Sequence, residues 1–255
     1  INLIFNNFKN MPLITTEGKE GKQFNVQKFY NLPEKVIHCS KCVVSNQRPR
    51  ITFDENNVCS ACNFAEKKNK YTDWKLREKE LEDLLDRHRR KDGYWDVVVP
   101  CSGGKDSVYV AHILKEKYNM NPLTATWAPM LYTDVGWRNL HHMIDSGIDN
   151  ILGTPDGKTH RTLTKLSLEI MGDVFQPFIY GQKGFPMAIA INYKIPLVMY
   201  GENGEVEYGG DLKNADVPTH NVTDDMTKHY FSGIHPEDFE KYGIDKKKLN
   251  YYYPP

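Results

Sequence analysis

Apolar and polar positions alternate with two different periods along most of this 255-residue chain. From residue 95 onward, short runs of apolar and β-branched residues are each followed by a stretch with the period of an amphipathic helix. The predicted strands are 95–100, 123–128, 150–154 and 195–201, and the predicted helices are 106–119, 136–147, 160–175 and 185–194. Strands that alternate with helices predict an α/β fold with a parallel sheet and right-handed crossovers.

The first 94 residues follow a different pattern. A helix that is charged on most faces is predicted over 73–90, with Trp74 and three leucines near one face, and Gly93 ends it. The predicted organisation is an N-terminal arm (1–35), a cysteine-rich module (36–70), a linking helix (71–94) and an α/β domain (95–255). Because the chain begins at Ile1 and ends without a helix stop or polar tail, we expect it to be part of a longer protein.

Four of the five cysteines form two closely spaced pairs. Cys39 pairs with Cys42 and Cys59 with Cys62, and sixteen residues separate the two pairs. Each pair places two thiolates on one turn, and two such turns complete the tetrahedron that zinc prefers. The spacing is typical of a zinc ribbon, and two redox motifs or chance are the weaker alternatives. Four thiolates leave no open position, so we expect a structural zinc with the adjacent His38 as a bystander.

A glycine-containing turn joins the first predicted α/β strand to the next helix. The strand 97–99 leads into the sequence SGGKDS, residues 102–107. Gly103 and Gly104 let the backbone approach a ligand, and the amides at the start of a helix favour a phosphate group. The two serines add hydroxyl donors, and Lys105 adds a positive charge. A turn without a ligand is the alternative, which this combination of residues disfavours.

The turn does not match the Walker A motif of P-loop enzymes. Gly104 and Lys105 are followed by Asp106 instead of Ser or Thr, and Val99 stands where the first glycine is required. A second candidate, residues 153–159, contains Gly-Lys-Thr, but only three residues separate its two glycines. We therefore predict that this second segment is a loop without a phosphate ligand.

The SGGKDS sequence, placed after the first α/β strand, resembles the PP-loop of the ATP pyrophosphatase superfamily. That group includes the synthetase parts of GMP synthetase and asparagine synthetase, and tRNA-modifying ligases. The resemblance implies a Rossmann-like fold that cleaves ATP between its α and β phosphates and adenylates a second substrate. It implies that the loop holds pyrophosphate, that Asp106 helps to hold magnesium, and that the backbone of 126–128 cradles adenine. The implied ATP-binding residues are Ser102, Gly103, Gly104, Lys105, Asp106, Ser107, Thr126, Trp127 and Ala128.

Several segments together resemble the N-acetyl sugar amidotransferase family of bacterial surface-polysaccharide and nonulosonic-acid pathways. They are CSKCVVSNQRPRITFDENNVCSACNFAEKK, PCSGGKDS, FIYGQKGFP and PLVMYGENGEVEYGG, in this order, within residues 30–255. The resemblance implies that the acetamido oxygen of a nucleotide-linked N-acetyl sugar attacks the α-phosphate of ATP. Ammonia then displaces AMP and leaves an acetamidino sugar for lipopolysaccharide O-antigen or a related surface glycan. Family members continue past YYYPP, in keeping with the expected truncation.

The source of ammonia and the sugar contacts follow from this resemblance. Cys101 is the one cysteine outside the pairs, and the chain does not begin with Cys, so no glutaminase nucleophile is evident. A separate glutaminase and a barrel subunit, similar to the histidine-biosynthesis pair, are the implied partners. The expected catalytic residues are Lys105, Asp106, Lys183 and Glu202, and the expected sugar contacts are Tyr180, Gln182, Lys183, Asn203 and Glu205. A plain turn at GENGE and a solvated Lys183 are equally weighted alternatives.

Charge and cysteine content bear on the rival functions. Lys and Arg together number 33, as do Asp and Glu, so the chain lacks the basic balance of a nucleic-acid-binding protein. This disfavours the main alternative, a tRNA thiolation enzyme, which also needs more spare cysteines than Cys101. A nucleotide sensor without turnover is disfavoured by the complete loop with its Lys and Asp. His141 and His142 are predicted to be satisfied within their helix rather than catalytic, and the side chains of Trp127 and Trp137 to be core or rim residues rather than ligand-stacking ones.

No secretory leader, membrane-length apolar stretch or secreted disulfide framework is evident in the sequence. We therefore expect a cytoplasmic protein without a membrane partner.

Overall fold

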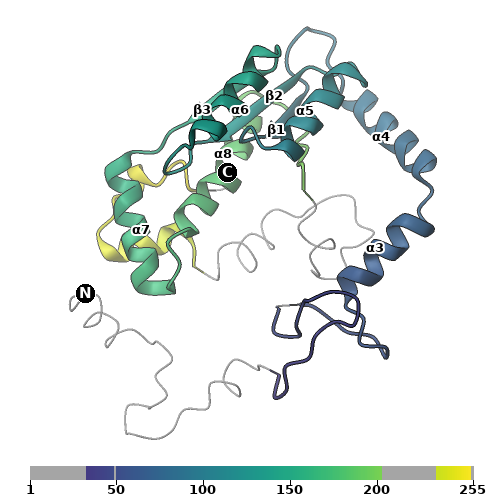
Figure 1. Ribbon diagram of the computed structural model, residues 1–255. Coiled ribbons are helices and arrows are strands. Elements are labelled where there is room, and N and C mark those ends of the chain that lie inside the picture. The colour runs from purple at the N-terminus through teal and green to yellow at the C-terminus, as the bar shows by residue number, and fades with distance from the viewer. Residues whose placement is uncertain (1–32, 49, 203–233, 254–255) are drawn as a thin grey trace, which may run out of the picture. The chain divides into compact units, whose positions relative to one another are not determined.

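The computed structural model describes residues 33–48, 50–202 and 234–253 (Figure 1). The chain divides into two compact units, and each is described by itself. The first contains the described residues up to Trp74, and the second contains 75–202 and 234–253.

The first unit is a small cysteine-centred module. Its helix α3 spans Ser60–Lys70, and two isolated antiparallel bridges, one of them between Phe53 and Cys59, organise the chain before the helix. Its core consists of two cysteines and Val58, with a few half-buried apolar side chains packed around them. Such a small apolar core stabilises a segment of this length poorly without a metal ion.

The second unit is an α/β unit, as the alternating pattern predicts. Its strands are β1 (Val97–Pro100), β2 (Pro122–Trp127) and β3 (Asp149–Gly153), which form a parallel sheet in the order β1-β2-β3. Its helices are α4 (Trp74–His88, whose first residue lies in the first unit), α5 (Lys105–Glu116), α6 (Asp134–Asp145), α7 (Gly157–Met171) and α8 (Gln176–Asn192). Two 3-10 helices, η3 (Pro236–Tyr242) and η4 (Lys246–Lys248), follow near the C-terminus. Among the described helices, none has the length and apolar character needed to cross a bilayer.

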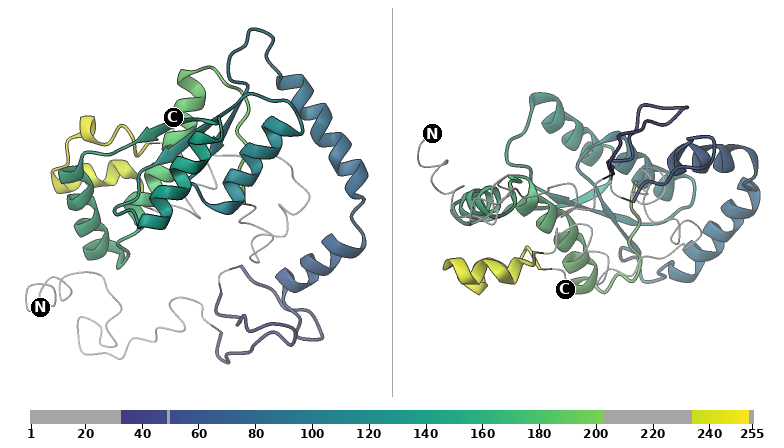
Figure 2. Two further views of the ribbon diagram at one scale, coloured as in Figure 1. Left: turned by 45° about the horizontal axis from the view of Figure 1, so that its top comes forward. Right: turned by 90° about the horizontal axis from the view of Figure 1, so that it is seen from below.

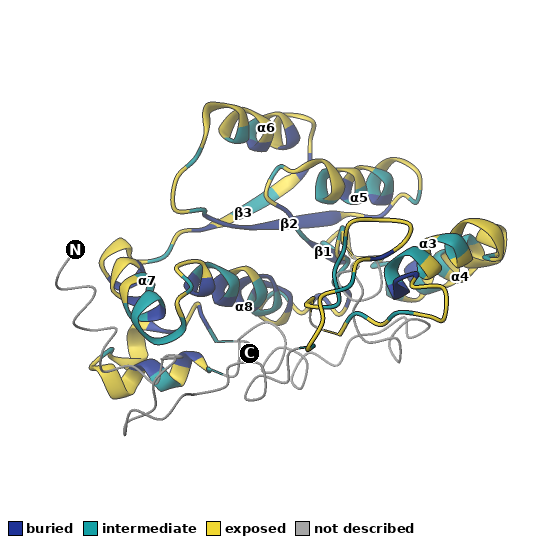
Figure 3. Cartoon of the chain, turned by 60° about the horizontal axis from the view of Figure 1, so that its bottom comes forward, coloured by how far each residue is buried: buried dark blue, intermediate teal, exposed yellow. Residues whose placement is uncertain are grey.

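Helices cover both faces of this sheet (Figures 2 and 3). Successive β1 side chains point to opposite faces: Val97 and Val99 join the core cluster under α5 and α6, whereas Val98 joins the cluster under α8. On β2, Leu123, Ala125 and Trp127 also face α8. Because helices cover both faces, the side chains on both sides of β1 are buried, and the strand is a continuous run of apolar residues.

The predicted strand 195–201 is reduced to a single bridge, which corrects the expectation. Val98 donates its N–H to the Leu197 carbonyl at 2.9 Å and accepts from the Met199 N–H at 2.9 Å, so the segment runs parallel to β1. The ladder stops there because Pro100 has no N–H to donate to the next carbonyl. The segment nevertheless occupies the edge of β1 opposite β2.

The predicted helix 185–194 is also wrong in its extent, since α8 begins at Gln176 and carries Pro186 inside it. Gly181, Gly184 and Pro186 all lower helix propensity, which hides the first half of α8 from a pattern-based prediction. These residues are buried against the sheet, so packing outweighs propensity. At Gly181 the backbone is pressed against Trp127: a Cβ there would lie 2.0 Å from the indole Cε2.

The C-terminal segment 234–253 completes the core next to α7 and α8. The Tyr180 hydroxyl donates to the Ile234 carbonyl at 2.7 Å, and Nδ1 of the buried His160 lies 2.9 Å from the Tyr252 hydroxyl. Tyr252 also contacts the Trp127 ring edge-on, with 5.6 Å between ring centroids. Burial lowers the pKa of His160 from its ordinary value of 6.5.

We expect Gly181→Ala to lower the free energy of unfolding by about 1–3 kcal/mol, because the added methyl group overpacks the contact with Trp127. Gly157→Ala is the matched control, since a Cβ at Gly157 meets nothing within 4 Å. Urea denaturation of both variants measures the difference. A Gly181→Ala protein as stable as the control would contradict the close packing of α8 on β2.

We expect acid to destabilise the second unit partly through His160. Its folded-state pKa is lowered, so the unfolded chain takes up a proton that the folded chain resists. The stability it contributes is complete above pH 6.5 and declines as the pH falls toward the folded-state value. Denaturation between pH 7 and 5 should show a shallower loss for His160→Asn than for wild type, and an equally steep loss in both proteins would contradict this role of His160.

Candidate functional site

The four paired cysteines meet in the first unit, as their spacing predicts. Their Sγ atoms all lie within 4.8 Å of one another. Cys39 Sγ lies 3.9 Å from Cys62 Sγ, and Cys42 Sγ lies 3.7 Å from Cys59 Sγ. Zinc–sulfur bonds of about 2.3 Å in a tetrahedron require sulfur atoms about 3.8 Å apart. The donor set and its spacing therefore fit a zinc ion.

Backbone N–H groups point at the sulfur atoms of this cluster. The amides of Lys41 and Cys59 donate to Cys39 Sγ at 3.3 and 3.2 Å, and the amide of Cys62 donates to Cys59 Sγ at 3.4 Å. Burial alone would raise the pKa of Cys39, but these amides outweigh it and lower the pKa to about 6. Four thiolates make a closed site, so a metal ion bound there would have a structural role.

The SGGKDS turn lies at the carboxyl end of β1 and leads directly into α5. Gly103 has φ +84°, and a Cβ there would lie 2.8 Å from the backbone N of Leu140 in α6. Only glycine fits this combination of left-handed backbone and close approach. Gly104 is the N-cap residue of α5 and has no side chain that could accept a hydrogen bond. The N-cap position therefore leaves the first amides of the helix without a side-chain partner.

Lys105 and Asp106 form an ion pair in this turn. Lys105 Nζ lies 2.6 and 2.8 Å from the two carboxylate oxygens of Asp106, and the two side chains are 86% and 50% exposed. An ion pair this exposed contributes little to stability, so it opens at small cost. Lys105 can then face an anion while the carboxylate faces a cation.

The segment beyond the bridge brings Gly201 against the first turn of α5. A Cβ at Gly201 would lie 2.8 Å from the Ser107 backbone N. The order across the sheet is therefore 197–199, β1, β2 and β3, and the direction of the connections reverses at β1. In open α/β sheets this switch point, at the carboxyl ends of the strands, is where ligands bind. Glu202 follows directly.

Lys183 reaches the same edge from α8. Its Nζ lies 5.0 Å from the centroid of the Tyr200 ring. Burial lowers the pKa of Lys183, and the charge of Glu202 opposes this shift. Gln182 is exposed on α8. Tyr180 is fully buried and bonds the Ile234 carbonyl, so the structure does not bring it to the surface near Lys183.

The residues at the end of β2 are buried. The Thr126 hydroxyl donates to the Cys101 carbonyl, and the Ala128 N–H donates to the Gly153 carbonyl at 2.9 Å. The Trp127 side chain faces α8, and its Nε1 has no hydrogen-bond partner among the described residues. The Ala128 amide is therefore already used within the sheet. The other two expected sugar contacts, Asn203 and Glu205, lie outside the described residues.

The second glycine-containing segment does not form a phosphate site. Asp156 caps α7 by accepting from the Lys158 N–H at 2.8 Å and the Thr159 N–H at 3.4 Å. The Lys248 ammonium and these amides hold the pKa of Asp156 well below its usual range. The carboxylate thus occupies the position that a phosphate would need.

Two features near the carboxyl edge of the sheet are not predicted from the sequence. Tyr200, which faces Lys183, was not singled out, although it directly precedes the glycine that touches α5. His141 was predicted to be satisfied within its helix, but its Nε2 is buried without a partner in the described part of the chain.

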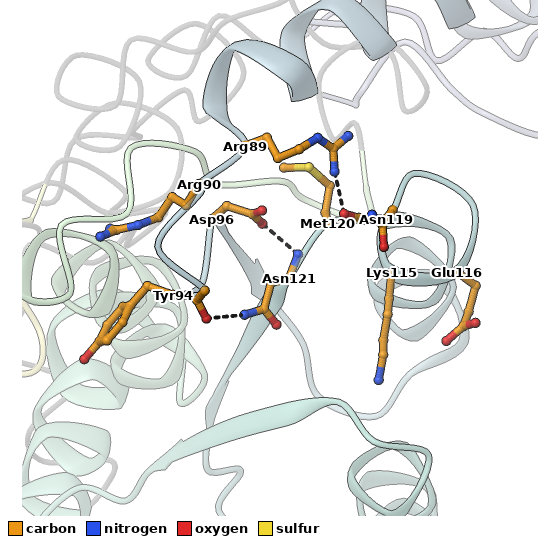
Figure 4. A pocket seen from close by; sticks show the side chains of 10 residues that line it. Arg89, Arg90, Tyr94, Asp96, Lys115, Glu116, Asn119, Met120 and Asn121 are labelled. Carbon is orange, nitrogen blue, oxygen red and sulfur yellow. Dashed lines mark hydrogen bonds between the residues drawn. The ribbon is translucent and has the colours of Figure 1, made fainter.

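A pocket of about 460 Å³ lies at the opposite, amino end of the strands (Figure 4). Asp96 and Asn121 precede β1 and β2, and Asp96 Oδ1 accepts from the Asn121 N–H at 2.9 Å. Asn121 Nδ2 donates to the Gly93 carbonyl at 3.4 Å, and Arg89 donates to the Asn119 carbonyl. These groups hold the connections below the sheet together, and we assign the pocket no chemical role.

Comparison with known proteins gives limited information about this chain. No protein-family profile matches it. It is 33% identical over 96 residues to an uncharacterized protein of Methanocaldococcus jannaschii. The match covers 34% of this chain and 31% of that protein, so the chain corresponds to less than a third of the length of this relative.

We expect wild-type protein to retain zinc and Cys42→Ser to lose most of it, because three thiolates bind the ion less tightly than four. Cys101→Ser is the matched control, since Cys101 lies in the second unit, outside the cluster. Elemental analysis after gel filtration with a chelator measures the metal content. Equal zinc in wild type and Cys42→Ser would contradict the four-cysteine site.

Proposed function

We propose that this chain is an ATP-dependent amidotransferase that converts the acetamido group of a nucleotide-linked N-acetyl sugar into an acetamidino group. The observation that carries the proposal is the SGGKDS turn, residues 102–107, at the start of α5 and at the point where the strand order reverses. Gly201 is pressed against the same turn, so the segment that ends in Glu202 lies next to it.

The turn offers three groups suited to the pyrophosphate part of ATP. The amides in the first turn of α5 have no side-chain cap, and the partial positive charge of the helix N-terminus favours phosphate. Lys105 is exposed at the same point and neutralises phosphate charge. Asp106, freed from its ion pair, is suited to hold the magnesium ion that accompanies ATP. Amides, a cation and a magnesium-binding carboxylate are the groups that the proposed PP-loop chemistry requires.

The reaction proceeds in two steps. The acetamido oxygen attacks the α-phosphate of ATP, an O-adenylyl imidate forms, and pyrophosphate leaves. Ammonia then adds to the imidate carbon, AMP leaves with the former acetamido oxygen, and a proton is lost from nitrogen. In this proposal Lys183, whose pKa is lowered by burial, accepts that proton, and Glu202 orients the ammonia.

Ammonia comes from a separate glutaminase acting with a barrel subunit in the cytoplasm. Cys101, the one cysteine outside the cluster, is only 5% exposed, and its Sγ lies 3.2 Å from Met143 Sδ. Burial raises the pKa of the Cys101 thiol, which makes it a poor nucleophile. This supports a chain without glutaminase activity of its own.

The same observation separates this proposal from a tRNA thiolation enzyme. Such an enzyme needs an accessible cysteine to carry sulfur, and the buried Cys101 does not meet that requirement. The equal numbers of acidic and basic residues also provide little attraction for tRNA.

We expect Lys105→Ala to reduce turnover roughly a hundredfold or more, because it removes charge stabilisation of the leaving pyrophosphate. Lys158→Ala is the matched control: it removes the lysine of the other Gly-Lys sequence, whose helix is already capped by Asp156. The assay measures AMP and pyrophosphate formed with ammonium chloride and UDP-linked N-acetylated sugars, with mass spectrometry of the sugar product.

Formation of AMP and pyrophosphate only when the sugar is present, with exchange of the sugar oxygen for NH, would support the proposal. Turnover with tRNA and a sulfur donor, and none with any sugar tested, would replace it with the thiolation enzyme. Equal activity of Lys105→Ala and Lys158→Ala would show that the SGGKDS turn is not the ATP site.

A further inference from the structure

Apolar side chains are exposed where β2 connects to α6. Leu131 in the connecting loop is 88% exposed, and Trp137 in the first turn of α6 is 42% exposed. Met130 and Val135, from the same stretch of chain, are exposed as well. Several exposed apolar side chains within one short segment are a candidate contact surface for a ligand or partner.

Three rings form the centre of this surface, and we refer to Tyr132, Trp137 and His141 as the α6 aromatic cluster. Tyr132 meets the Trp137 indole edge-on, with 5.0 Å between ring centroids and 77° between ring planes. His141, one turn further along α6, lies 4.3 Å from the indole at 59°. The indole therefore contacts two neighbouring rings, while 42% of the residue stays exposed.

The cluster lies near the SGGKDS turn. The close approach of Gly103 to Leu140 fixes α6 against this turn. Trp137 precedes Leu140 by three residues, which is about 4.5 Å along a helix. Because α6 follows β2, its first turn lies at the carboxyl edge of the sheet, where the turn also lies. Figure 3 shows α5 and α6 on the same face of the sheet.

Two buried polar atoms accompany the exposed indole. The Tyr132 hydroxyl and His141 Nε2 have no hydrogen-bond partner within the described ranges. Burial of the Tyr132 ring raises its pKa, so the hydroxyl stays neutral. The cluster therefore presents an aromatic surface beside a turn suited to phosphate.

We propose that the α6 aromatic cluster stacks the base of a nucleotide held at this edge of the sheet, with Trp137 as the stacking residue. A flat ring on an exposed, fixed indole gains dispersion and stacking energy without ordering new side chains. Phosphates of the same nucleotide would lie toward the turn. The inference rests on the proposed function, and the base belongs either to ATP or to the nucleotide that carries the sugar.

Titration calorimetry on the full, zinc-loaded chain tests this proposal with three probes. They are magnesium-ATP, UDP and tripolyphosphate, which carries charge but no base. Trp137→Ala is expected to weaken binding of at least one of the nucleotides roughly 5- to 150-fold, the range for loss of one stacked base. Tripolyphosphate affinity should change less than about twofold, because phosphate contacts lie outside the cluster.

Two further variants distinguish the loss of base stacking from a general folding defect. Trp137→Phe keeps a stacking ring and should retain most of the nucleotide affinity. Tyr109→Ala removes a 63%-exposed ring from α5, outside the cluster, and should bind both nucleotides as wild type does. A loss for ATP identifies adenine as the stacked base, whereas a loss for UDP identifies the base of the sugar carrier.

Unchanged affinity of Trp137→Ala for both nucleotides, with tripolyphosphate still bound through Lys105, would overturn this inference alone. Equal losses in Trp137→Ala and Tyr109→Ala would overturn it as well. Failure of wild type to bind tripolyphosphate or ATP would overturn the proposed function and this inference together.

Discussion

Two backbone contacts that leave no room for a side chain hold the carboxyl edge of the sheet together. Gly103 touches the backbone of α6 at Leu140, and Gly201 touches the backbone of α5 at Ser107. A Cβ at either glycine would come within 3 Å of main-chain atoms, which cannot move aside as a flexible side chain can. These contacts bring the SGGKDS turn, the first turn of α6 and the segment before Glu202 to one place. Every chemical role proposed for the second unit depends on this convergence.

The first unit depends on a different interaction. Its apolar core is too small to order a segment of about forty residues, whereas a four-thiolate metal site contributes folding free energy directly. Two backbone amides donate to Cys39 Sγ and lower the pKa of its thiol, which favours the thiolate that a metal ion needs. The two units therefore differ in what can order them: the first offers four thiolates suited to a metal ion, whereas apolar packing on both faces of a sheet orders the second.

The sequence predicted the local features of both units well. The strands β1 and β2 and the cysteine cluster follow from short-range patterns, and the structure confirms them. The predicted extents of two elements were wrong because tertiary contacts, not local sequence patterns, determine where those elements begin and end. The segment 195–201 has a strand-like composition, yet it pairs only at Val98 because Pro100 offers no N–H. The first half of α8 contains glycines that disfavour a helix, yet they allow its close packing against Trp127.

The same distinction applies to the candidate site. The groups proposed to hold phosphate are consecutive in the sequence, so a short motif is enough to suggest them. The other groups gathered at this edge come from elements far apart in the chain. Lys183 belongs to α8, Tyr200 follows the bridge segment, and Trp137 belongs to α6. No single short motif contains all three, because only the folded sheet brings these elements to one edge. A sequence of this kind therefore indicates the nucleotide chemistry more readily than the substrate on which it acts.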